Sequence, residues 1–181
     1  MADLLPEGFL SGTPSLDPDV FVAAGARIVG EVRLEEGVSI WYNCVLRADL
    51  AAISVGQNTN LQDGTVVHVD TGQPCRIADH VTVGHGAILH GCTVESGCLI
   101  GMGAIVLSGA VIGRGSVIAA GALIREDVRV EPFSLMAGVP ARLVRKLPDE
   151  TLEKHLEVAL KYAEAGRRHR GLALRGEPPA I

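Results

Sequence analysis

The sequence predicts an all-β fold, a parallel β-helix built from hexapeptide repeats, on the strength of three observations. Aliphatic residues recur at six-residue intervals along most of the 181-residue chain. Hydrophobic residues make up 48% of the chain but aromatic residues only 3%, which is typical of many similar short strands. A small residue often follows the aliphatic one, as in Val55-Gly56 and Ile112-Gly113, where the chain can turn a corner.

The repeat places an inward-facing residue on each side of a triangular coil. Three hexapeptides make a coil of roughly 18 residues, and coils stack at about 4.8 Å. A gap of nine residues before Val55 and one of ten before Ile77 predict loops at Ala51-Ala52 and Asp70–Pro74. The repeat is expected to end after Ile124, giving nearly six coils. Its 17 positions are Val22, Ile28, Leu34, Ile40, Leu46, Val55, Leu61, Val67, Ile77, Val83, Leu89, Val94, Ile100, Val106, Ile112, Ile118 and Ile124.

A single helix is expected after the repeat. Gly138-Val139-Pro140-Ala141 predicts an exit turn, and Asp149 predicts the N-cap of a helix that runs to about Ala165. The tail Gly171–Ile181 is expected to lack regular structure. We therefore expect a β-helix domain over residues 1–145 and a C-terminal helix and tail, packed on it, over 146–181. The apolar stripe of the expected helix consists of Leu152, Leu156, Ala159, Leu160 and Ala163.

Composition argues against several classes of partner. The net charge of −5 makes nucleic acid an unfavourable partner. No apolar run is long enough to cross a membrane, and the N-terminus lacks the basic and apolar segments of a signal peptide. Four cysteines without C-x-x-C spacing fit a cytoplasmic protein with reduced thiols.

Two histidines stack when the sequence is wound onto the coils. His68 follows Val67, and His90 follows Leu89, three repeat positions later, so both lie on the same side of successive coils and point outwards. Arg47 joins the same column one coil earlier. His85 lies on a neighbouring side, beside Gln62 and above Asp63.

Within one chain His85 is expected to face away from His68 and His90, so we expect a three-fold homotrimer in which His85 of one subunit meets the His68–His90 pair of the next. Three histidines with one open position form a catalytic rather than a structural zinc site. Arg47 with Asp49 is expected to form an ion pair at the interface. Solvated histidines are the simpler alternative for the trio. His80 is expected to be structural, His169 to lie on the surface, and the cysteines to be inert small hydrophobic residues.

At this point the sequence resembles the compact form of the gamma-class carbonic anhydrase family, over about residues 10 to 165. The spaced histidines together with Arg-x-Asp and Gln-Asp are the specific part of the resemblance, and the Gly-x-Pro-Ala exit is shared with hexapeptide acyltransferases. The matching segments are Arg47-Ala48-Asp49, Asn60-Leu61-Gln62-Asp63, His68-Val69-Asp70, Val83–Cys92, Ile100–Ala104 and Gly138–Ala141.

The resemblance implies a left-handed β-helix trimer with metal ions at the subunit interfaces. It implies reversible hydration of carbon dioxide to bicarbonate by a metal-bound hydroxide, with Zn²⁺ as the metal and Fe²⁺ or Co²⁺ as alternatives. Gln62 matches a residue that hydrogen-bonds the hydroxide. Asn60 matches a nearby polar position, Arg47 and Asp49 match an interface pair, and Asp63 is a candidate beside a ligand. The matching metal ligands are His68, His85 and His90.

Two departures from the family bear on activity. The glutamates of the family's acidic loop have no counterpart in Leu50-Ala51-Ala52 or in the short loop after His68, where only Asp70 is acidic. A tyrosine close to the site in many relatives is expected to be replaced by His155. We therefore expect weak hydration activity or a need for added buffer. Two alternatives remain: a hexapeptide acyltransferase or CoA-thioester hydrolase, and a non-catalytic metal-binding scaffold or assembly protein.

Overall fold

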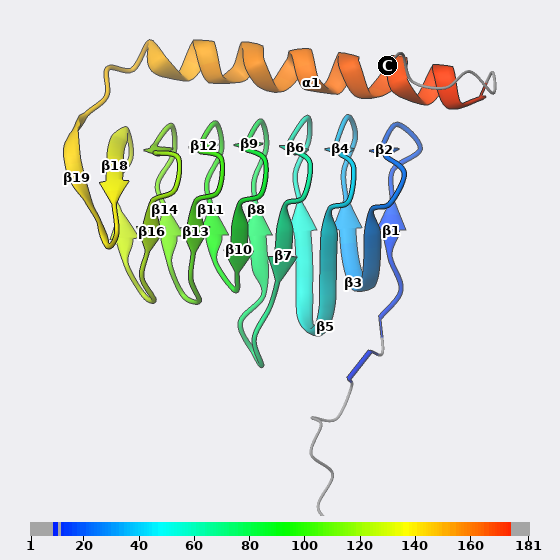
Figure 1. Ribbon diagram of the computed structural model, residues 1–181, viewed down its shortest axis with the longest axis horizontal. Helices are drawn as coiled ribbons and strands as arrows, with labels where there is room; N and C mark the ends of the chain where they lie inside the picture. The colour runs from blue at the N-terminus through cyan, green and yellow to red at the C-terminus, as the bar shows by residue number, and fades with distance from the viewer. Residues whose placement is uncertain (1–8, 11, 175–181) are drawn as a thin grey trace, which may run out of the picture.

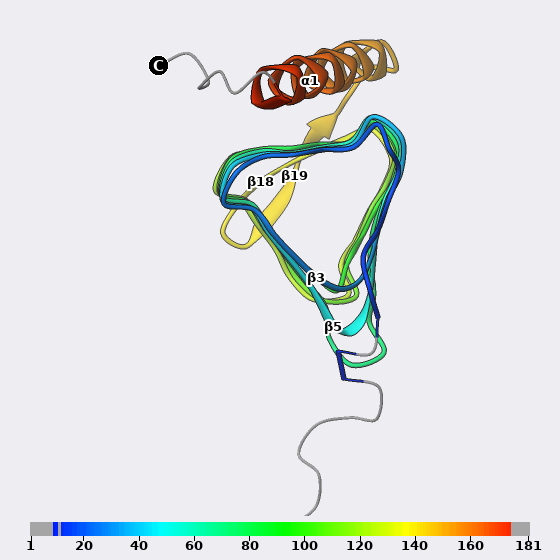
Figure 2. The same ribbon diagram turned by 90° about the vertical axis from the view of Figure 1, so that its right-hand side faces the viewer.

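The computed structural model describes residues 9–10 and 12–174, and these form a three-sided β-helix with one long helix along it (Figures 1 and 2). The first side holds the start of β3 (Arg27–Leu34), the start of β5 (Val45–Val55), β7 (Val66–His68), β10 (Ile88–His90), β13 (Ile105–Val106) and β16 (Leu123–Ile124). The second side holds β1 (Ser15–Leu16), the ends of β3 and β5, β8 (Cys75–Ile77), β11 (Thr93–Val94), β14 (Val111–Ile112) and β17 (Arg129–Val130). The third side holds β2 (Phe21–Val22), β4 (Ser39–Ile40), β6 (Asn60–Leu61), β9 (Thr82–Val83), β12 (Leu99–Ile100), β15 (Val117–Ile118) and β18 (Ser134–Gly138).

All strand pairs between coils are parallel, and β19 (Ala141–Lys146) alone turns back antiparallel on β18 among the described strands. Seen from its N-terminal end in Figure 2, the chain winds anticlockwise as it recedes, which is a left-handed coil. The pairing register stacks the aliphatic positions directly, with Leu46 against Val67 and Val67 against Leu89. These three side chains are fully buried, and the predicted repeat positions from Leu34 to Ile124 all lie in the core, whereas Val22 in the first coil is exposed.

The repeat extends further in both directions than predicted. Leu16 in β1, Val130 in β17 and Met136 in β18 keep the six-residue step and add three positions, which is one more coil. The expected end at Ile124 is therefore wrong. The repeat is hard to recognise here because Val130 lies between two charged residues, Arg129 and Glu131. In the structure both are exposed at outward positions, where charged side chains are solvated.

The two predicted loops have different structures. Asp70 and Gln73 form a bridge across a tight turn, which confirms a loop in that stretch. At Ala51-Ala52 the chain instead stays in β5, which pairs with β3 around the corner with a register shift between Gly30 and Val32. Both features protrude at the lower corner of the triangle in Figure 2. Strands β3 and β5 continue around this corner together and remain paired, so β5 forms a bulge there and not a loop.

The helix α1 (Thr151–Leu174) runs back along the third side toward the first coil (Figure 1). It is longer than predicted because its second half finds partners on the first coils. Gly166 packs on Phe21, where an added Cβ would lie 3.0 Å from the Phe21 Cβ, and Arg167 binds Asp19. The expected tail from Gly171 is thus partly helical, and residues 175–181 lie outside the described part. No described helix is long and apolar enough to cross a membrane.

An aromatic cluster fills the space between α1 and the first coils. The His169 ring lies 5.0 Å from that of Trp41, centroid to centroid, and its Nδ1 is 3.3 Å from the Tyr42 hydroxyl. Phe21 and Tyr162 complete the cluster. The expectation that His169 is a surface residue is wrong, because its ring packs inwards against Trp41 and Phe21.

Candidate metal centre

The two stacked histidines face each other across one coil. His68 in β7 and His90 in β10 are paired residues of neighbouring strands, and their rings lie 5.0 Å apart. Nδ1 of His68 is 3.0 Å from Nε2 of His90. Two nitrogens that bind one tetrahedral zinc ion at about 2.0–2.1 Å lie about 3.3 Å apart, so the pair has nearly the spacing of shared ligands. Burial and the nearby His68 lower the pKa of His90, which favours the neutral, metal-binding form.

Each of the three predicted ligands has its second ring nitrogen next to a protein oxygen. Nε2 of His68 is 3.0 Å from an Asp49 oxygen, and Nδ1 of His85 is 2.8 Å from an Asp63 oxygen. Nδ1 of His90 is 2.8 Å from the Ser108 hydroxyl. Metal-binding histidines usually have such partners, which fix the ring and its tautomer. The donor set therefore fits a metal ion on the opposite nitrogens.

Asp49 is a buried carboxylate between two partners. It binds Arg47 as well as His68. Burial disfavours its ionised form, but the hydrogen bonds from Arg47 and His68 outweigh burial and hold the pKa of Asp49 below its ordinary value. The predicted Arg47–Asp49 ion pair therefore forms within one chain, with the arginine half exposed.

His85 lies on a different side of the prism from the other two histidines. It follows β9 on the third side, and its side chain and that of Asp63 are nearly half exposed. In the described part of one chain, no group of three His, Cys, Asp or Glu side chains is arranged to hold a metal ion. The described residues of one chain therefore do not bring the three predicted ligands together.

A chain of buried side-chain hydrogen bonds on the third side links Thr82, Asn60 and Gln62. Asn60 donates to the Thr82 hydroxyl at 2.9 Å, and Gln62 donates through Nε2 to the Asn60 carbonyl oxygen at 3.3 Å. Gln62 and His85 border one hollow of about 490 Å³ whose lining is mostly apolar, including Met102. The Oε1 atom of Gln62 is thus the part of the amide that remains for another partner.

The structure brings Tyr162 rather than His155 to this hollow. Tyr162 of α1 lines it, and burial together with the nearby charge of Asp63 raises the pKa of its hydroxyl. His155 is buried elsewhere, with Nδ1 2.8 Å from the Gly97 carbonyl oxygen, so the expected substitution by His155 is wrong. The signal was present in the sequence, because Tyr162 lies three residues after Ala159 of the predicted apolar stripe.

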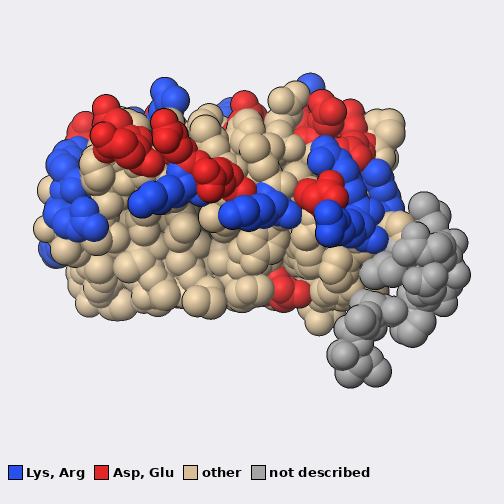
Figure 3. Space-filling view, turned by 90° about the horizontal axis from the view of Figure 1, so that it is seen from above, with Lys and Arg blue, Asp and Glu red and all other residues tan. Residues whose placement is uncertain are grey.

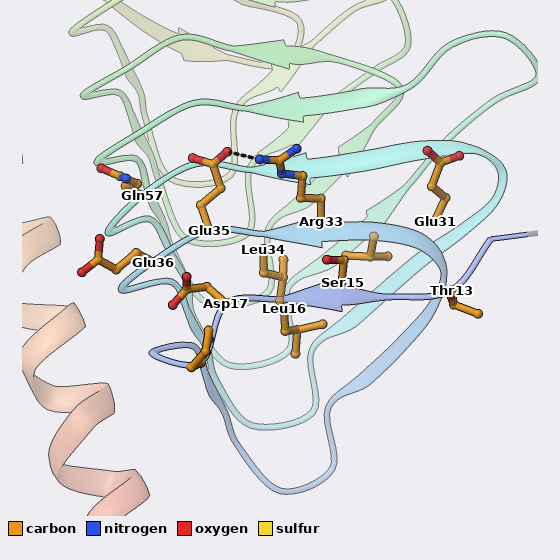
Figure 4. A pocket seen from close by; sticks show the side chains of 12 residues that line it. Thr13, Ser15, Leu16, Asp17, Glu31, Arg33, Leu34, Glu35, Glu36 and Gln57 are labelled. Atoms are coloured by element: carbon orange, nitrogen blue, oxygen red, sulfur yellow. Dashed lines mark ion pairs between the residues drawn. The ribbon is translucent and has the colours of Figure 1, made fainter.

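A larger hollow, of about 770 Å³, lies at the N-terminal end of the second side and is separate from these residues (Figure 4). Asp17, Glu31 and Glu35 surround it, and Glu35 forms an ion pair with Arg33. None of the residues predicted for the metal site borders it.

The fold and these side chains define a hexapeptide-repeat β-helix protein that carries a pair of stacked histidines. Residues 91–126 match the bacterial transferase hexapeptide family (six repeats). A probable carbonic anhydrase of Methanocaldococcus jannaschii is 47% identical over 82% of this chain and 94% of its own length. Gamma carbonic anhydrase 2 of Arabidopsis thaliana mitochondria is 44% identical over 87% of this chain, which spans 59% of that plant protein. The chain belongs to the gamma carbonic anhydrase family.

Solved structures with other names share the fold. A putative acetyltransferase of Bacillus cereus superposes with a TM-score of 0.86 at 36% identity, covering 89% of this chain and 94% of that one. A hexapeptide transferase family protein of Anaplasma phagocytophilum gives a TM-score of 0.82 at 40% identity, with coverage of 86% and 92%. The scaffold is therefore common to proteins named for two different chemistries.

Proposed function

We propose that this protein is a metal-dependent carbonic anhydrase that interconverts carbon dioxide and bicarbonate at three sites shared between the subunits of a homotrimer. The observation that carries the proposal is the His68–His90 pair, with facing nitrogens 3.0 Å apart and each outer nitrogen next to an oxygen. Family membership supports the reaction. The free thiols of all four cysteines support a cytoplasmic location.

The trimer is supported by the surface beside the histidine pair. Val66, Ile88 and Ile105 form an outward column on neighbouring strands of the first side, and Ile88 is more than a third exposed. Seen from above in Figure 3, the part of the prism that α1 leaves uncovered, on the third side, shows almost no Lys, Arg, Asp or Glu, whereas the helix itself is densely charged. Uncharged apolar surface of this kind is typical of an interface.

His68 and His90 of one subunit and His85 of the next would hold the ion. Three neutral imidazoles leave a bound Zn²⁺ cationic, and such an ion lowers the pKa of a bound water to about 7, which supplies hydroxide at neutral pH. Zn²⁺ is the proposed metal, with Fe²⁺ or Co²⁺ as alternatives that nitrogen ligands also accept.

The chain's own residues orient the reactants. Gln62 offers Oε1 to a hydrogen at the site, because its amide nitrogen is bound to Asn60. Arg47, half exposed and fixed by Asp49, places a positive charge near the site that favours bicarbonate. Proton transfer to solvent is the step for which the chain supplies the fewest ionisable side chains, since Asp70 is the one acidic residue in the loop after His68. We therefore expect turnover that rises with buffer concentration.

Acyl transfer from a CoA thioester is the second candidate. The apolar hollow of about 490 Å³ beside His85 and the similarity to a putative acetyltransferase favour it. It predicts acyl-CoA turnover by metal-free protein, whereas the carbonic anhydrase proposal predicts none. A non-catalytic scaffold predicts bound metal without either activity.

The shared site can be tested with subunits that lack different ligands. His85→Ala and His90→Ala chains are each purified, measured for metal and carbon dioxide hydration, then unfolded together and refolded as a mixture. Each variant alone is expected to lose both metal and hydration. In a mixed trimer one interface joins an intact His68–His90 pair to an intact His85, so about one metal per mixed trimer returns, together with hydration.

The same mixture excludes a site within one chain. As the control, two variants that both carry His85→Ala are mixed and refolded. This mixture is expected to stay inactive, because no chain in it supplies His85. Mixed trimers of the two different variants that recover neither metal nor hydration would contradict the shared site. Recovered metal without hydration would favour the scaffold.

A further inference from the structure

Ser108 contacts His90 from the next coil of the prism. It lies in the turn after β13, and its Oγ is 2.8 Å from Nδ1 of His90. The stacking of the coils fixes this contact, because Gly109 donates its N–H to the Gly91 carbonyl oxygen at 2.9 Å. Gly91 also leaves room for the hydroxyl, since a Cβ there would lie 3.1 Å from Oγ of Ser108.

The contact determines which nitrogen of His90 is available. A neutral imidazole carries one N–H, and its other nitrogen has the lone pair that binds a metal. Nε2 of His90 faces Nδ1 of His68, so the hydrogen belongs on Nδ1, where the Ser108 oxygen accepts it. In the same way, an oxygen of Asp49 can accept the hydrogen on the second ring nitrogen of His68, and an oxygen of Asp63 that of His85.

A serine can serve as the acceptor only if its own hydrogen has somewhere to go. Ser108 and His90 border a hollow of about 480 Å³ that Asp70, Gln73 and Asp127 also line. Those groups and water offer acceptors for the hydroxyl hydrogen. The serine oxygen therefore stays free to accept from the imidazole.

We propose that Ser108 is a positioning residue of the metal centre, which accepts the Nδ1 hydrogen of His90 and holds the ring with Nε2 toward the ion. This inference rests on the proposed function. It concerns metal affinity and the histidine tautomer, so it can be tested without any measurement of hydration.

The test compares zinc affinity in three variants by competition with a chromophoric chelator. Ser108→Ala is expected to weaken zinc binding by about 10- to 100-fold, as losses of such partners do. Ser108→Thr keeps the hydroxyl and is expected to bind zinc like the wild type. Ser96→Ala is the matched control, because Ser96 occupies the same place in an equivalent turn, also followed by a glycine with positive φ, Gly97.

Co²⁺-substituted protein gives a second measurement that a purely structural role would not change. Proton NMR of the paramagnetic protein shows the N–H hydrogens of ligand histidines as shifted, exchangeable signals. The Nδ1 hydrogen of His90 is expected to exchange faster with water in Ser108→Ala and at the wild-type rate in Ser108→Thr and Ser96→Ala. Molar mass by light scattering verifies that each variant assembles like the wild type.

Two results would overturn the inference. If Ser108→Ala matches Ser96→Ala in zinc affinity and in exchange of the N–H signal, Ser108 does not position His90, and the proposed function still stands. If the wild-type protein binds none of Zn²⁺, Fe²⁺ and Co²⁺, the proposed function fails and this inference fails with it.

Discussion

At the scale of single residues, hydrogen bonds between buried amides decide which atom of Gln62 is left for a further partner. Asn60 donates to Thr82, so its carbonyl oxygen accepts from Nε2 of Gln62. A glutamine amide has one donor end and one acceptor end, and fixing the first determines the second. The orientation of Gln62 therefore depends on Asn60, which need not touch any substrate.

The Asn60→Ala variant tests this orientation. Without the Asn60 oxygen the Gln62 amide can rotate, so we expect kcat/KM for carbon dioxide hydration to fall about tenfold. Metal content is expected to stay at the wild-type level, because neither amide is a proposed ligand. Gln57→Ala, which removes an exposed amide, is the control. Lost metal in Asn60→Ala would show that the amide chain supports the ligands instead.

At the scale of elements, the second half of α1 is held to the first coil by charge. Asp19, in the turn between β1 and β2, accepts hydrogen bonds from Arg167 at 2.8 Å and Arg170 at 2.9 Å. The hydrogen bond from Arg167 is the main reason that the pKa of Asp19 lies below its ordinary value of 3.8. A carboxylate with a lowered folded-state pKa stabilises the fold above 3.8, and this contribution is lost as the pH falls through the folded-state pKa.

Thermal unfolding of Asp19→Asn as a function of pH tests the clamp. We expect a lower unfolding temperature than wild type at neutral pH and convergence of the two proteins below pH 3.8. Glu164→Gln is the control, since its pair with Arg168 is exposed on the helix surface and contributes little. A difference that stays constant down to low pH would mean that packing, not charge, causes the loss.

The elements also show which parts of the fold the sequence could predict. The stacking of Leu46, Val67 and Leu89, and hence of His68 on His90, follows from the sequence alone, because three aliphatic repeat positions make one coil even where the insertions before Val55 and Ile77 lengthen it. The end of α1 does not, because its partner Asp19 is 148 residues from Arg167. The Ser108–His90 contact could not be predicted from the repeat either. It depends on how the side chain of one residue reaches the next coil, which the repeat positions do not determine.

At the scale of the whole molecule, the outward apolar column on the first side is the proposed trimer contact. Ile88 lies in it between Val66 and Ile105. A charge at this position would be desolvated on association with no partner. The proposed association therefore requires the column to remain uncharged.

The Ile88→Glu variant tests the column by molar mass. We expect the association constant to fall at least about 100-fold, with monomers in light scattering and loss of metal, because a buried unpaired carboxylate is costly. Leu160→Glu, on the exposed face of α1, is the matched control and is expected to remain trimeric with its metal. A trimeric, metal-bound Ile88→Glu protein would place the interface elsewhere.

The return of α1 to the first coil has a consequence for synthesis on the ribosome. Asp19 emerges 148 residues before Arg167, which at 5–20 residues per second is a delay of roughly 7 to 30 s. Throughout that interval Phe21 and Trp41 have no helix over them, although the coils that carry them can already stack. A nascent chain therefore presents an uncovered aromatic surface until α1 has been translated, and the first coil to be made is covered only after all the later coils.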